Sequence, residues 1–372
     1  MEYARFAHVE VDLGAIRHNV AALKGLTSPG TLFMAVVKAD AYGHGAAAVA
    51  RAALESGANR LGVATLAEAI ELRDAGISSE LQLLSEPPPA AIPHILDHSL
   101  ITAITTRDFA LELGRLASSR GVDARFHLKI DTGMNRVGVR AEDAVEFTAA
   151  LRGLSGIAHE GTFTHFATAD APGDWDFERQ MQRFTSALLK MRDEGLDPGI
   201  VHAANSAATI LHPESHLHMV RCGIAIYGLH PAGSTYGAID LRPAMSVKAR
   251  VTFVKRLAMG DGVSYGLTWR AAAPTVIATL PLGYADGVHR VLSNNMEVLL
   301  GGIRCPQVGR VCMDQFMVEV PRGLRVAHGD EAVLVGSQGP ESITMDELAT
   351  SAGTINYEMA CAFGMRMGRT YI

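Results

Sequence analysis

The chain has 372 residues, of which 48% are hydrophobic and 19% are charged. Chains of this length usually contain two or three domains of roughly 150 residues, and this composition excludes disordered and fibrous proteins. With 33 basic and 39 acidic residues the net charge is −6, and no cluster of Lys and Arg is interleaved with aromatic residues. We therefore expect neither a nucleic-acid partner nor binding to a membrane surface.

The N-terminal sequence MEYARFAHVEVDLG lacks a basic start followed by an apolar stretch, so we expect no signal peptide. No apolar run approaches the roughly 18 residues of a membrane-spanning helix. The cysteines form no CxxC pair, and in a chain of this length we interpret them as reduced thiols. These features together predict a cytoplasmic enzyme. The cysteines are Cys222, Cys305, Cys312 and Cys361.

Apolar runs of strand length alternate with segments of helical period in the first part of the chain, which indicates repeated βα units. Eight such strands over about 230 residues match the size of a (β/α)8 barrel, so we predict an α/β fold of this TIM type. The expected strands are 31–38, 60–65, 81–85, 101–105, 125–131, 161–167, 200–205 and 219–226.

Beyond residue 240 the segments are apolar, rich in β-formers and punctuated by glycine. One helix is expected, from about Met345 to Ala352, because Thr344 and Glu347 form the signature of a capping box. We therefore divide the chain into a barrel domain, 1–240, and a mainly β domain, 241–372. The N-terminal strand 7–12 is a candidate to pair with the second domain.

Barrel enzymes work at the C-terminal ends of their strands, where this sequence places polar residues. Lys38 closes the apolar run LFMAVVK and is followed by the glycine-punctuated segment 39–45. Its amine either extends from the strand end into water or, if desolvated, is a nucleophile that forms a Schiff base. The other strand-end residues are Lys129, Asp131, His165, His202, Asn205 and Arg221.

Three histidines at barrel strands have two interpretations. His127, His165 and His202 could be metal ligands or core histidines with hydrogen-bond partners. The first strand ends in Lys38 rather than a His-x-His pair, and Arg221 on the last strand would repel a cation. We therefore expect no metal site.

The loops after the last two barrel strands are suited to a phosphate group. Asn205 and Ser206 precede a helix start, and Arg221 is followed by Gly223. Backbone N–H groups at such positions often bind phosphate, and Lys38 on the first strand completes the pattern for a phosphate-bearing cofactor. In the second domain, Tyr265 lies in the glycine-flanked turn GVSYG, where it is either packed or functional. Periodicity does not distinguish these alternatives.

The segment AVVKADAYGHG closely resembles the cofactor-lysine motif of the pyridoxal-phosphate (PLP) dependent alanine racemases. The resemblance extends nearly from end to end, in the family's order. It implies a barrel that binds PLP and a β domain that contributes residues to the partner's active site in a homodimer. The further matching motifs are VEVDLGAIRHN, LKIDTGMNRVG, THFATAD, HAANSAA, VRCGIAIYG, VSYG, PLGYADG, VGRVCMDQ and TINYE.

The resemblance implies a racemase with a base on each face of the alanine Cα. Lys38 would hold PLP as a Schiff base and act on D-alanine, and Tyr265 of the partner subunit would act on L-alanine. His165 and Arg221 would favour the tyrosinate form of that tyrosine, because a nearby positive charge favours an ionised phenol. Arg221 would also donate to the pyridine nitrogen, which then stays unprotonated.

The resemblance also implies the binding residues. Arg136 would meet the substrate carboxylate with the backbone N–H of Met313, and Tyr284 would line the substrate entrance. Lys129 matches a lysine that is carbamylated in some members, where it orients the arginine that matches Arg136. The residues implied at the cofactor are Lys38, Tyr42, His165, Asn205, Ser206, Arg221, Gly223, Ile224 and Tyr357.

The implied activity is interconversion of L-alanine and D-alanine, with D-alanine supplied to peptidoglycan. Two rival PLP families fit less well. Amino-acid decarboxylases of this architecture carry a HxGxGS loop and a C-terminal cysteine motif that this chain lacks, and single-barrel PLP-binding proteins are shorter and have no β domain. Action on serine or other amino acids and a catabolic role stay open. The departures from the family are Asn135, where glycine is common, and a tail without the usual proline.

Overall fold

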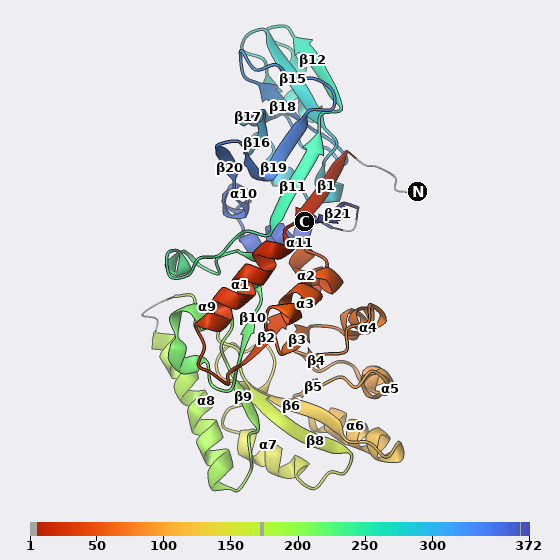
Figure 1. The fold of residues 1–372 in the computed structure, drawn as a ribbon, viewed down its shortest axis with the longest axis vertical. Helices are drawn as coiled ribbons and strands as arrows, with labels where there is room; N and C mark the ends of the chain where they lie inside the picture. Colours follow the sequence, from red (N-terminus) through yellow and green to blue (C-terminus); the bar gives the residue numbers. More distant parts are fainter. Residues whose placement is uncertain (1–5, 172–174, 365) are drawn as a thin grey trace. The chain divides into compact units, whose positions relative to one another are not determined.

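The computed structural model describes residues 6–171, 175–364 and 366–372, which group into two compact units. The barrel unit contains Gly14–Ala41 and Ala46–Pro243, and the β unit contains Met1–Leu13, Tyr42–Gly45 and Ala244–Ile372. Figure 1 gives the labels of their elements. In the described part of the chain, no helix combines the length and apolar character needed to cross a membrane.

The barrel unit is built on a ring of parallel strands. They are hydrogen-bonded in the order β4-β3-β2-β10-β9-β8-β6-β5, and a parallel bridge between Gln82 and Ile101 links β4 to β5 and closes the ring. Their side chains are mostly buried because both faces of a parallel sheet are covered. The strands are β2 (Leu32–Val36), β3 (Arg60–Val63), β4 (Glu80–Leu83), β5 (Thr102–Ile104), β6 (Ala124–Asp131), β8 (Ile157–Phe163), β9 (Ile200–His202) and β10 (Met219–Cys222).

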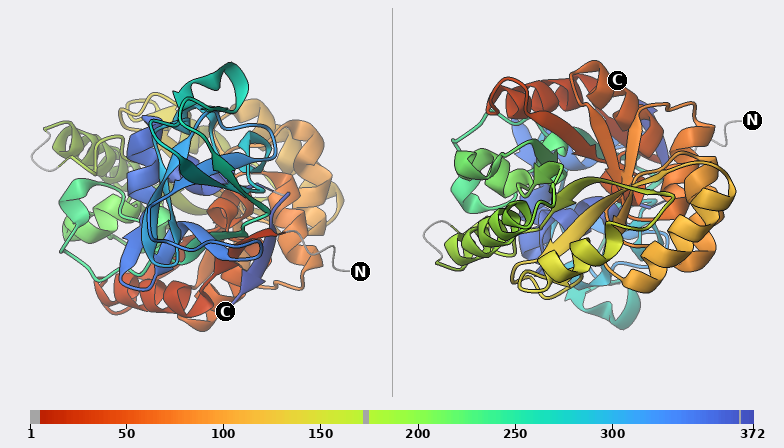
Figure 2. Two further views of the ribbon diagram at one scale, coloured as in Figure 1. Left: turned by 90° about the horizontal axis from the view of Figure 1, so that it is seen from above. Right: turned by 90° about the horizontal axis from the view of Figure 1, so that it is seen from below.

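Helices surround this ring, as the view from below shows (Figure 2). Several begin at side-chain caps that the sequence supplies: Thr65 forms a capping box with Glu68, and Thr106 and Asn205 accept backbone N–H groups of their helices. The helices are α1 (Leu13–Gly25), α3 (Ala46–Glu55), α4 (Leu66–Asp74), α5 (Ile92–Asp97), α6 (Arg107–Ser119), α7 (Ala144–Leu151), α8 (Trp175–Asp193) and α9 (Ser206–Leu211). A short strand, β7 (Val139–Arg140), pairs with β6.

The β unit contains a sheet in the order β12-β15-β18-β17-β16-β19-β11-β1-β21, with β20 beside β19. A separate two-stranded hairpin joins β13 and β14. The strands of the β unit are β1 (Ala7–Val11), β11 (Met245–Arg250), β12 (Phe253–Leu257), β13 (Gly262–Val263), β14 (Trp269–Arg270), β15 (Thr275–Leu280), β16 (Glu297–Leu300), β17 (Ile303–Val308), β18 (Phe316–Val320), β19 (Glu331–Gln338), β20 (Glu341–Ile343) and β21 (Gly368–Tyr371). Two helices follow β20: α10 (Met345–Ala352) and α11 (Asn356–Ala362).

The structure confirms the predicted fold class, a (β/α)8 barrel followed by a mainly β domain, and all eight predicted barrel strands occur. Strand 7–12 pairs with the second domain through β11 and β21. The expected division after residue 240 differs from the observed grouping, which starts at Ala244 and adds 1–13 and 42–45 to the β unit. These two segments group there because β1 is a strand of its sheet and Gly43 accepts a hydrogen bond from Arg369.

Two details differ from the sequence prediction. Strand β8 starts at Ile157 and ends at Phe163, earlier than the expected 161–167, so His165 follows the strand instead of lying in it. Helix α10 occurs as predicted with Thr344 as its cap, but α11 was not predicted. The segment of α11 is short and has no side-chain cap, so its local signal is weak.

Candidate active site

Lys38 follows β2 and begins a short turn of helix, α2 (Lys38–Gly43), with unusual backbone geometry. Ala39, Asp40, Ala41 and Tyr42 all have φ between 52° and 53°, so this turn is left-handed. A left-handed conformation costs a non-glycine residue roughly 1–2 kcal/mol, and such strain persists only where the surroundings hold it.

Two carboxylates hold the left-handed turn. Glu68 Oε1 accepts the backbone N–H of Ala39 at 2.8 Å, and Asp40 Oδ1 accepts that of Ala46 at 2.8 Å. On the other side of Lys38, the hydroxyl of buried Tyr227 donates to the carbonyl of Val36 at 2.8 Å. The backbone on both sides of Lys38 is therefore fixed. Glu68 was not predicted from the sequence as part of this arrangement.

Arg221, on β10, is a buried cation at the end of the barrel. Its guanidinium donates to Nδ1 of His202 at 3.0 Å, to the carbonyl of Thr164 at 2.7 Å and to that of Ala203 at 3.1 Å. Burial lowers the pKa of Arg221 to about 10, so the side chain is still protonated at neutral pH. Fixed carbonyls and an imidazole thus set the direction of its remaining donors.

His165 lies directly beside this guanidinium. Its Nδ1 is 3.3 Å from Arg221 Nη2, and because arginine only donates, Nδ1 must accept and Nε2 carries the proton. Burial and the charge of Arg221 hold the pKa of His165 well below its usual value. His165 is therefore a neutral imidazole with one N–H to offer, and the positive charge expected at this position resides on Arg221.

The loops after β9 and β10 are linked by a serine. Ser206 Oγ accepts the backbone N–H of Gly223 at 3.0 Å and that of Ala225 at 3.4 Å. Asn205 caps the helix that Ser206 begins by accepting the N–H of Ala208. Ile224, next to Gly223, starts a short 3-10 turn and is buried. The structure thus brings together four of the residues expected at the cofactor phosphate.

Lys129, on β6, lies within electrostatic range of three other cationic side chains. Burial first, and then the charges of Arg136, Arg221 and Lys38, lower the pKa of Lys129 to about 8. Its Nζ donates to the carbonyl of Leu84 at 3.3 Å and lies 5.4 Å from the centre of the Phe163 ring. About a tenth of this amine is consequently uncharged at about pH 7, far more than for an ordinary lysine.

Arg136 is exposed in the loop between β6 and β7. Asp131 Oδ1 shapes this loop by accepting the backbone N–H groups of Gly133 and Asn135, both at 3.0 Å. Asn135 has a φ of 55°, a left-handed conformation that asparagine tolerates better than most residues. The departure from the family's glycine at this position therefore leaves the loop conformation accessible.

Three expected residues of the β unit lie on neighbouring loops. Tyr265 is 71% exposed in a turn whose Ser264 donates to the carbonyl of Arg310 at 2.7 Å. Tyr284 N–H donates to the carbonyl of Cys312, which precedes exposed Met313. These contacts link Tyr265, Tyr284 and Met313 through residues 310–313.

Tyr42 and Tyr357 also lie within the β unit. Their ring centres are 6.3 Å apart and the rings are tilted by 55°. Tyr42 is 9% exposed, and Tyr357 comes from α11. The structure thus pairs two tyrosines that the resemblance implied at the cofactor.

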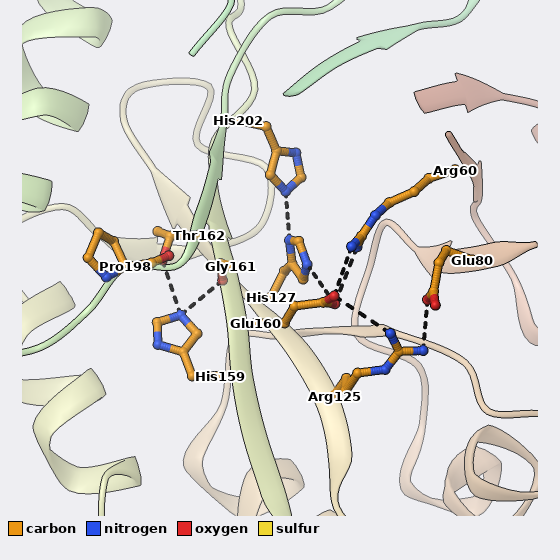
Figure 3. Close-up of polar contacts among 10 residues, drawn as sticks. All are labelled: Arg60, Glu80, Arg125, His127, His159, Glu160, Gly161, Thr162, Pro198 and His202. Atoms are coloured by element: carbon orange, nitrogen blue, oxygen red, sulfur yellow. Dashed lines mark hydrogen bonds and ion pairs between the residues drawn. The ribbon is translucent and has the colours of Figure 1, made fainter. Parts of the chain in front are cut away.

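The histidines considered as metal ligands have other partners. His127 Nδ1 and His202 Nε2 are 2.7 Å apart, and His127 Nε2 contacts Glu160 (Figure 3). The other nitrogen of His202 accepts from Arg221. Over the described ranges, no three His, Cys, Asp or Glu side chains are placed to hold a metal ion. His127 and His202 are therefore core histidines with hydrogen-bond partners.

Known proteins match this chain over nearly its whole length. Residues 11–231 match the family model of the alanine racemase N-terminal domain, and residues 244–371 match that of the C-terminal domain. The chain belongs to the alanine racemase family. The alanine racemase of Desulfovibrio desulfuricans is 44% identical over 372 residues, covering 100% of both chains. That of Symbiobacterium thermophilum is 47% identical, covering 97% of this chain and 96% of the relative.

Solved structures agree with this membership. The alanine racemase of Bacillus anthracis with bound L-Ala-P has a TM-score of 0.95 and 39% identity, covering 100% of this chain and 96% of that one. The enzyme from D-cycloserine-producing Streptomyces lavendulae has a TM-score of 0.93 and 38% identity, covering 100% and 98%. The two rival PLP families considered from the sequence are therefore set aside.

Alanine racemases are PLP-dependent isomerases, so the chain is an enzyme and PLP is its cofactor. The surroundings of Arg221 test whether the site of this chain can hold PLP. The side chain of Arg221 is only 3% exposed, and its hydrogen bonds to His202, Thr164, His165 and Ala203 come from Nη1 and Nη2, so none of these four bonds uses Nε–H. A guanidinium N–H only donates, and an unprotonated pyridine nitrogen is an acceptor that it can serve. The site therefore fits PLP.

Proposed function

We propose that this chain interconverts L-alanine and D-alanine by moving the Cα proton between Lys38 and Tyr265, which act on opposite faces of cofactor-bound alanine. One observation carries the proposal: Lys38 closes a buried barrel strand, in a strained and braced turn, in a chain that belongs to the alanine racemase family. A racemase needs a base on each face of Cα, and amine and phenol groups serve as such bases.

PLP, when bound, withdraws electrons from the substrate Cα and makes its proton acidic. Lys38 Nζ would hold the cofactor, and the Nε–H of Arg221 would donate to the pyridine nitrogen. Arginine keeps its proton, so this nitrogen would stay unprotonated and electron withdrawal through the ring would be limited. We infer that this restraint suits a racemase, which must return the proton to Cα.

The phosphate of PLP would be held by hydroxyl and backbone N–H groups. Ser206, its neighbour Asn205 and the backbone at Gly223 and Ile224 are supplied by the barrel, where the Ser206 hydroxyl already joins the two loops. Tyr42 and Tyr357 would add phenolic hydroxyls. Neutral hydroxyls and backbone N–H groups hold a phosphate dianion through hydrogen bonds without adding cationic charge.

Tyr265 would act in the active site of a partner subunit, so we propose a homodimer with shared sites. Its 71% exposure and the short braced turn that carries it support this role, because such a phenol is presented outward in a fixed position. His165 Nε2–H, with Arg221 behind it, would donate to the tyrosinate Oη. A neutral donor backed by a buried cation favours the ionised form of a phenol.

Arg136 would bind the substrate carboxylate, together with the Met313 backbone N–H from the partner, while Tyr284 would line the entrance. Lys129 would be carbamylated and so provide an anion that orients Arg136. A pKa of about 8 supports this modification, since only a neutral amine reacts with carbon dioxide. Carbon-13 NMR after incubation with labelled bicarbonate tests it. The absence of a carbamate signal, or a signal that persists in Lys129→Ala, would count against the modification.

We further propose that the enzyme works in the cytoplasm and supplies D-alanine for peptidoglycan. All four cysteines are free in the structure, as expected of thiols in a reducing compartment. Membership in a family that makes D-alanine supports the biosynthetic role.

The function is tested by incubating purified protein with PLP and L-alanine and separating the enantiomers by chiral chromatography. Approach to an equal mixture, abolished in Lys38→Ala, supports the proposal, and unchanged L-alanine with bound cofactor contradicts it. L-serine measured in parallel reports the breadth of specificity. Mixing inactive Lys38→Ala and Tyr265→Ala chains should restore one intact site per heterodimer. No recovery in a verified heterodimer would contradict the shared site.

A further inference from the structure

Arg221 is a buried cation whose direct hydrogen-bond partners are all neutral. It donates to two carbonyl oxygens and to imidazole nitrogens, and within the described ranges no carboxylate forms an ion pair with it. A charge removed from water is normally compensated by an opposite charge. The compensating group for Arg221 must therefore act from beyond its immediate neighbours.

A chain of hydrogen bonds connects Arg221 to a carboxylate deeper in the barrel. Arg221 Nη1 lies 3.0 Å from His202 Nδ1, and His202 Nε2 lies 2.7 Å from His127 Nδ1. His127 Nε2 then lies 3.2 Å from Oε2 of Glu160. Figure 3 shows the two imidazoles and the carboxylate in line. The strands β10, β9, β6 and β8 each supply one member, so the chain is internal to the barrel unit.

The carboxylate at the end of this chain is firmly held. Arg60 donates to both oxygens of Glu160, at 2.8 and 3.3 Å, and Arg125 lies 3.6 Å from Oε1. Glu160 reaches this position through a β-bulge: His127 pairs with Gly161 and Phe126 with His159, which leaves Glu160 as the extra residue. Bulges commonly redirect one side chain next to an active site.

Arg221 and Glu160, the two ends of this hydrogen-bond chain, fix the position of every proton in it. Arg221 can only donate, so His202 Nδ1 must accept, and the proton of a neutral His202 is on Nε2. That N–H points at His127 Nδ1, which must accept in turn, so His127 also carries its proton on Nε2. The Nε2–H of His127 donates to Glu160, an acceptor-only carboxylate. A guanidinium and a carboxylate are thus joined through two neutral imidazoles with a single direction of donation.

The electrostatics of the barrel agree with this assignment independently. Burial lowers the pKa of His127, and burial and Arg221 hold that of His202 well below its usual value, so both rings are neutral at physiological pH. For Glu160, burial raises the pKa, but hydrogen bonds from His127 and Arg60 outweigh it and lower the pKa to about 2. His202 also stacks on Phe163, with ring centres 4.8 Å apart, which fixes its plane.

We propose that Glu160 is the remote counter-ion of Arg221 and acts, through His127 and His202, as a positioning residue for its guanidinium. This chain of hydrogen bonds prevents the guanidinium of Arg221 from rotating away and leaves Nε–H as its donor toward the cofactor. This last role rests on the proposed function, in which Arg221 faces the pyridine nitrogen. Glu160 and the two imidazoles thus affect the cofactor through Arg221, without themselves touching substrate or cofactor.

Nitrogen-15 NMR of the full-length protein, labelled at the histidine rings, tests the proton order directly. We expect His127 and His202 to have protonated Nε2 and unprotonated Nδ1 from about pH 6 to about pH 8, the range in which an ordinary histidine titrates. A proton on Nδ1 of either ring, or an imidazolium in this range, would overturn the inference. This measurement needs no substitution, so it decides the matter even if a variant fails to fold.

Glu160→Gln tests the positioning role, with Glu80→Gln as its matched control. An amide has one acceptor oxygen, which Arg60 and His127 cannot both use fully, whereas Glu80 pairs with Arg125 and contacts no imidazole. We expect altered His127 and His202 signals and about tenfold weaker PLP binding to the Glu160→Gln apoprotein, similar to the loss of an outer partner at metal sites. Glu80→Gln should change neither. A folded Glu160→Gln protein with unchanged signals and affinity would contradict the proposal.

A second pair of variants separates positioning from packing. His127→Gln should weaken PLP binding as Glu160→Gln does, whereas His159→Gln, a change at a partly buried histidine next to Glu160 in sequence, should not. Equal PLP affinities of the two variants would overturn the role of the hydrogen-bond chain. The two proposals fail separately: unchanged L-alanine with bound cofactor refutes the proposed function, whereas a proton on Nδ1 of His127 or His202 refutes only the hydrogen-bond chain.

Discussion

His159 provides the sharpest test of how burial controls ionisation in this barrel. It lies on β8 beside Glu160, stacks on Phe126 with ring centres 5.0 Å apart, and donates through Nε2 to the carbonyl of Gly161 at 2.9 Å. Burial lowers the pKa of His159 to about 4, against 6.5 for the free side chain. The folded protein therefore resists protonating this ring, while the unfolded chain does not.

This difference fixes how stability changes with pH. At pH values above 6.5 the ring is neutral in both states and contributes no pH dependence. As pH falls from 6.5 to 4, the unfolded state binds a proton that the folded state does not, so the free energy of unfolding decreases; below 4 both states are protonated and the decrease stops. With these two pKa values, the loss at about pH 5 is about 2 kcal/mol.

The assay compares His159→Gln with the parent protein by equilibrium urea unfolding, followed by circular dichroism at about pH 8 and about pH 5. Glutamine keeps an amide donor for Gly161 but does not titrate, so the variant should lose about 2 kcal/mol less between the two pH values. His127 and His202 titrate in both proteins, and their contributions cancel in the comparison. An equal loss in the two proteins would refute the argument from burial.

Three further substitutions test the supports of the site and of the β unit. Tyr227→Phe removes a buried donor to the Val36 carbonyl and should lower the free energy of unfolding in urea by about 1–2 kcal/mol. Gly43→Ala places a Cβ against the carbonyl oxygen of Ala360 at a φ of 81°, so we expect a loss of about 2 kcal/mol or more and weaker PLP binding in a cofactor titration. Thr344→Ala removes the cap of α10 and should cost about 1 kcal/mol, seen as a lower melting temperature, whereas Thr344→Ser should restore it.

The sequence was most informative where apolar strands end in charged residues. Lys38 and Arg221 became candidates because each closes or interrupts a buried strand, a position that periodicity predicts, whereas the role of each was implied only by the resemblance to a family. The cap of α10 was equally visible, since Thr344 and Glu347 are close in sequence and their interaction is local.

Features that depend on tertiary contacts were not predictable in this way. The segment IAHE at the start of β8 has no apolar alternation, so the strand was predicted to begin after Glu160 and the bulge was missed. The left-handed turn after Lys38 has no sequence signature, because its non-glycine residues are held in place by Glu68 from α4. Backbone strain of this kind becomes visible only when the residues that hold it are seen.

The pairing of β1 with β21 has a consequence for synthesis of the chain. β1 is translated before every strand of the barrel, yet its two neighbours in the sheet, β11 and β21, come from residues 245–250 and 368–371. Every strand of the barrel is translated before either neighbour, and domains generally fold as units during translation. The sheet of the β unit is therefore complete only after β21 has been made, and an edge of β1 is available to other chains until then.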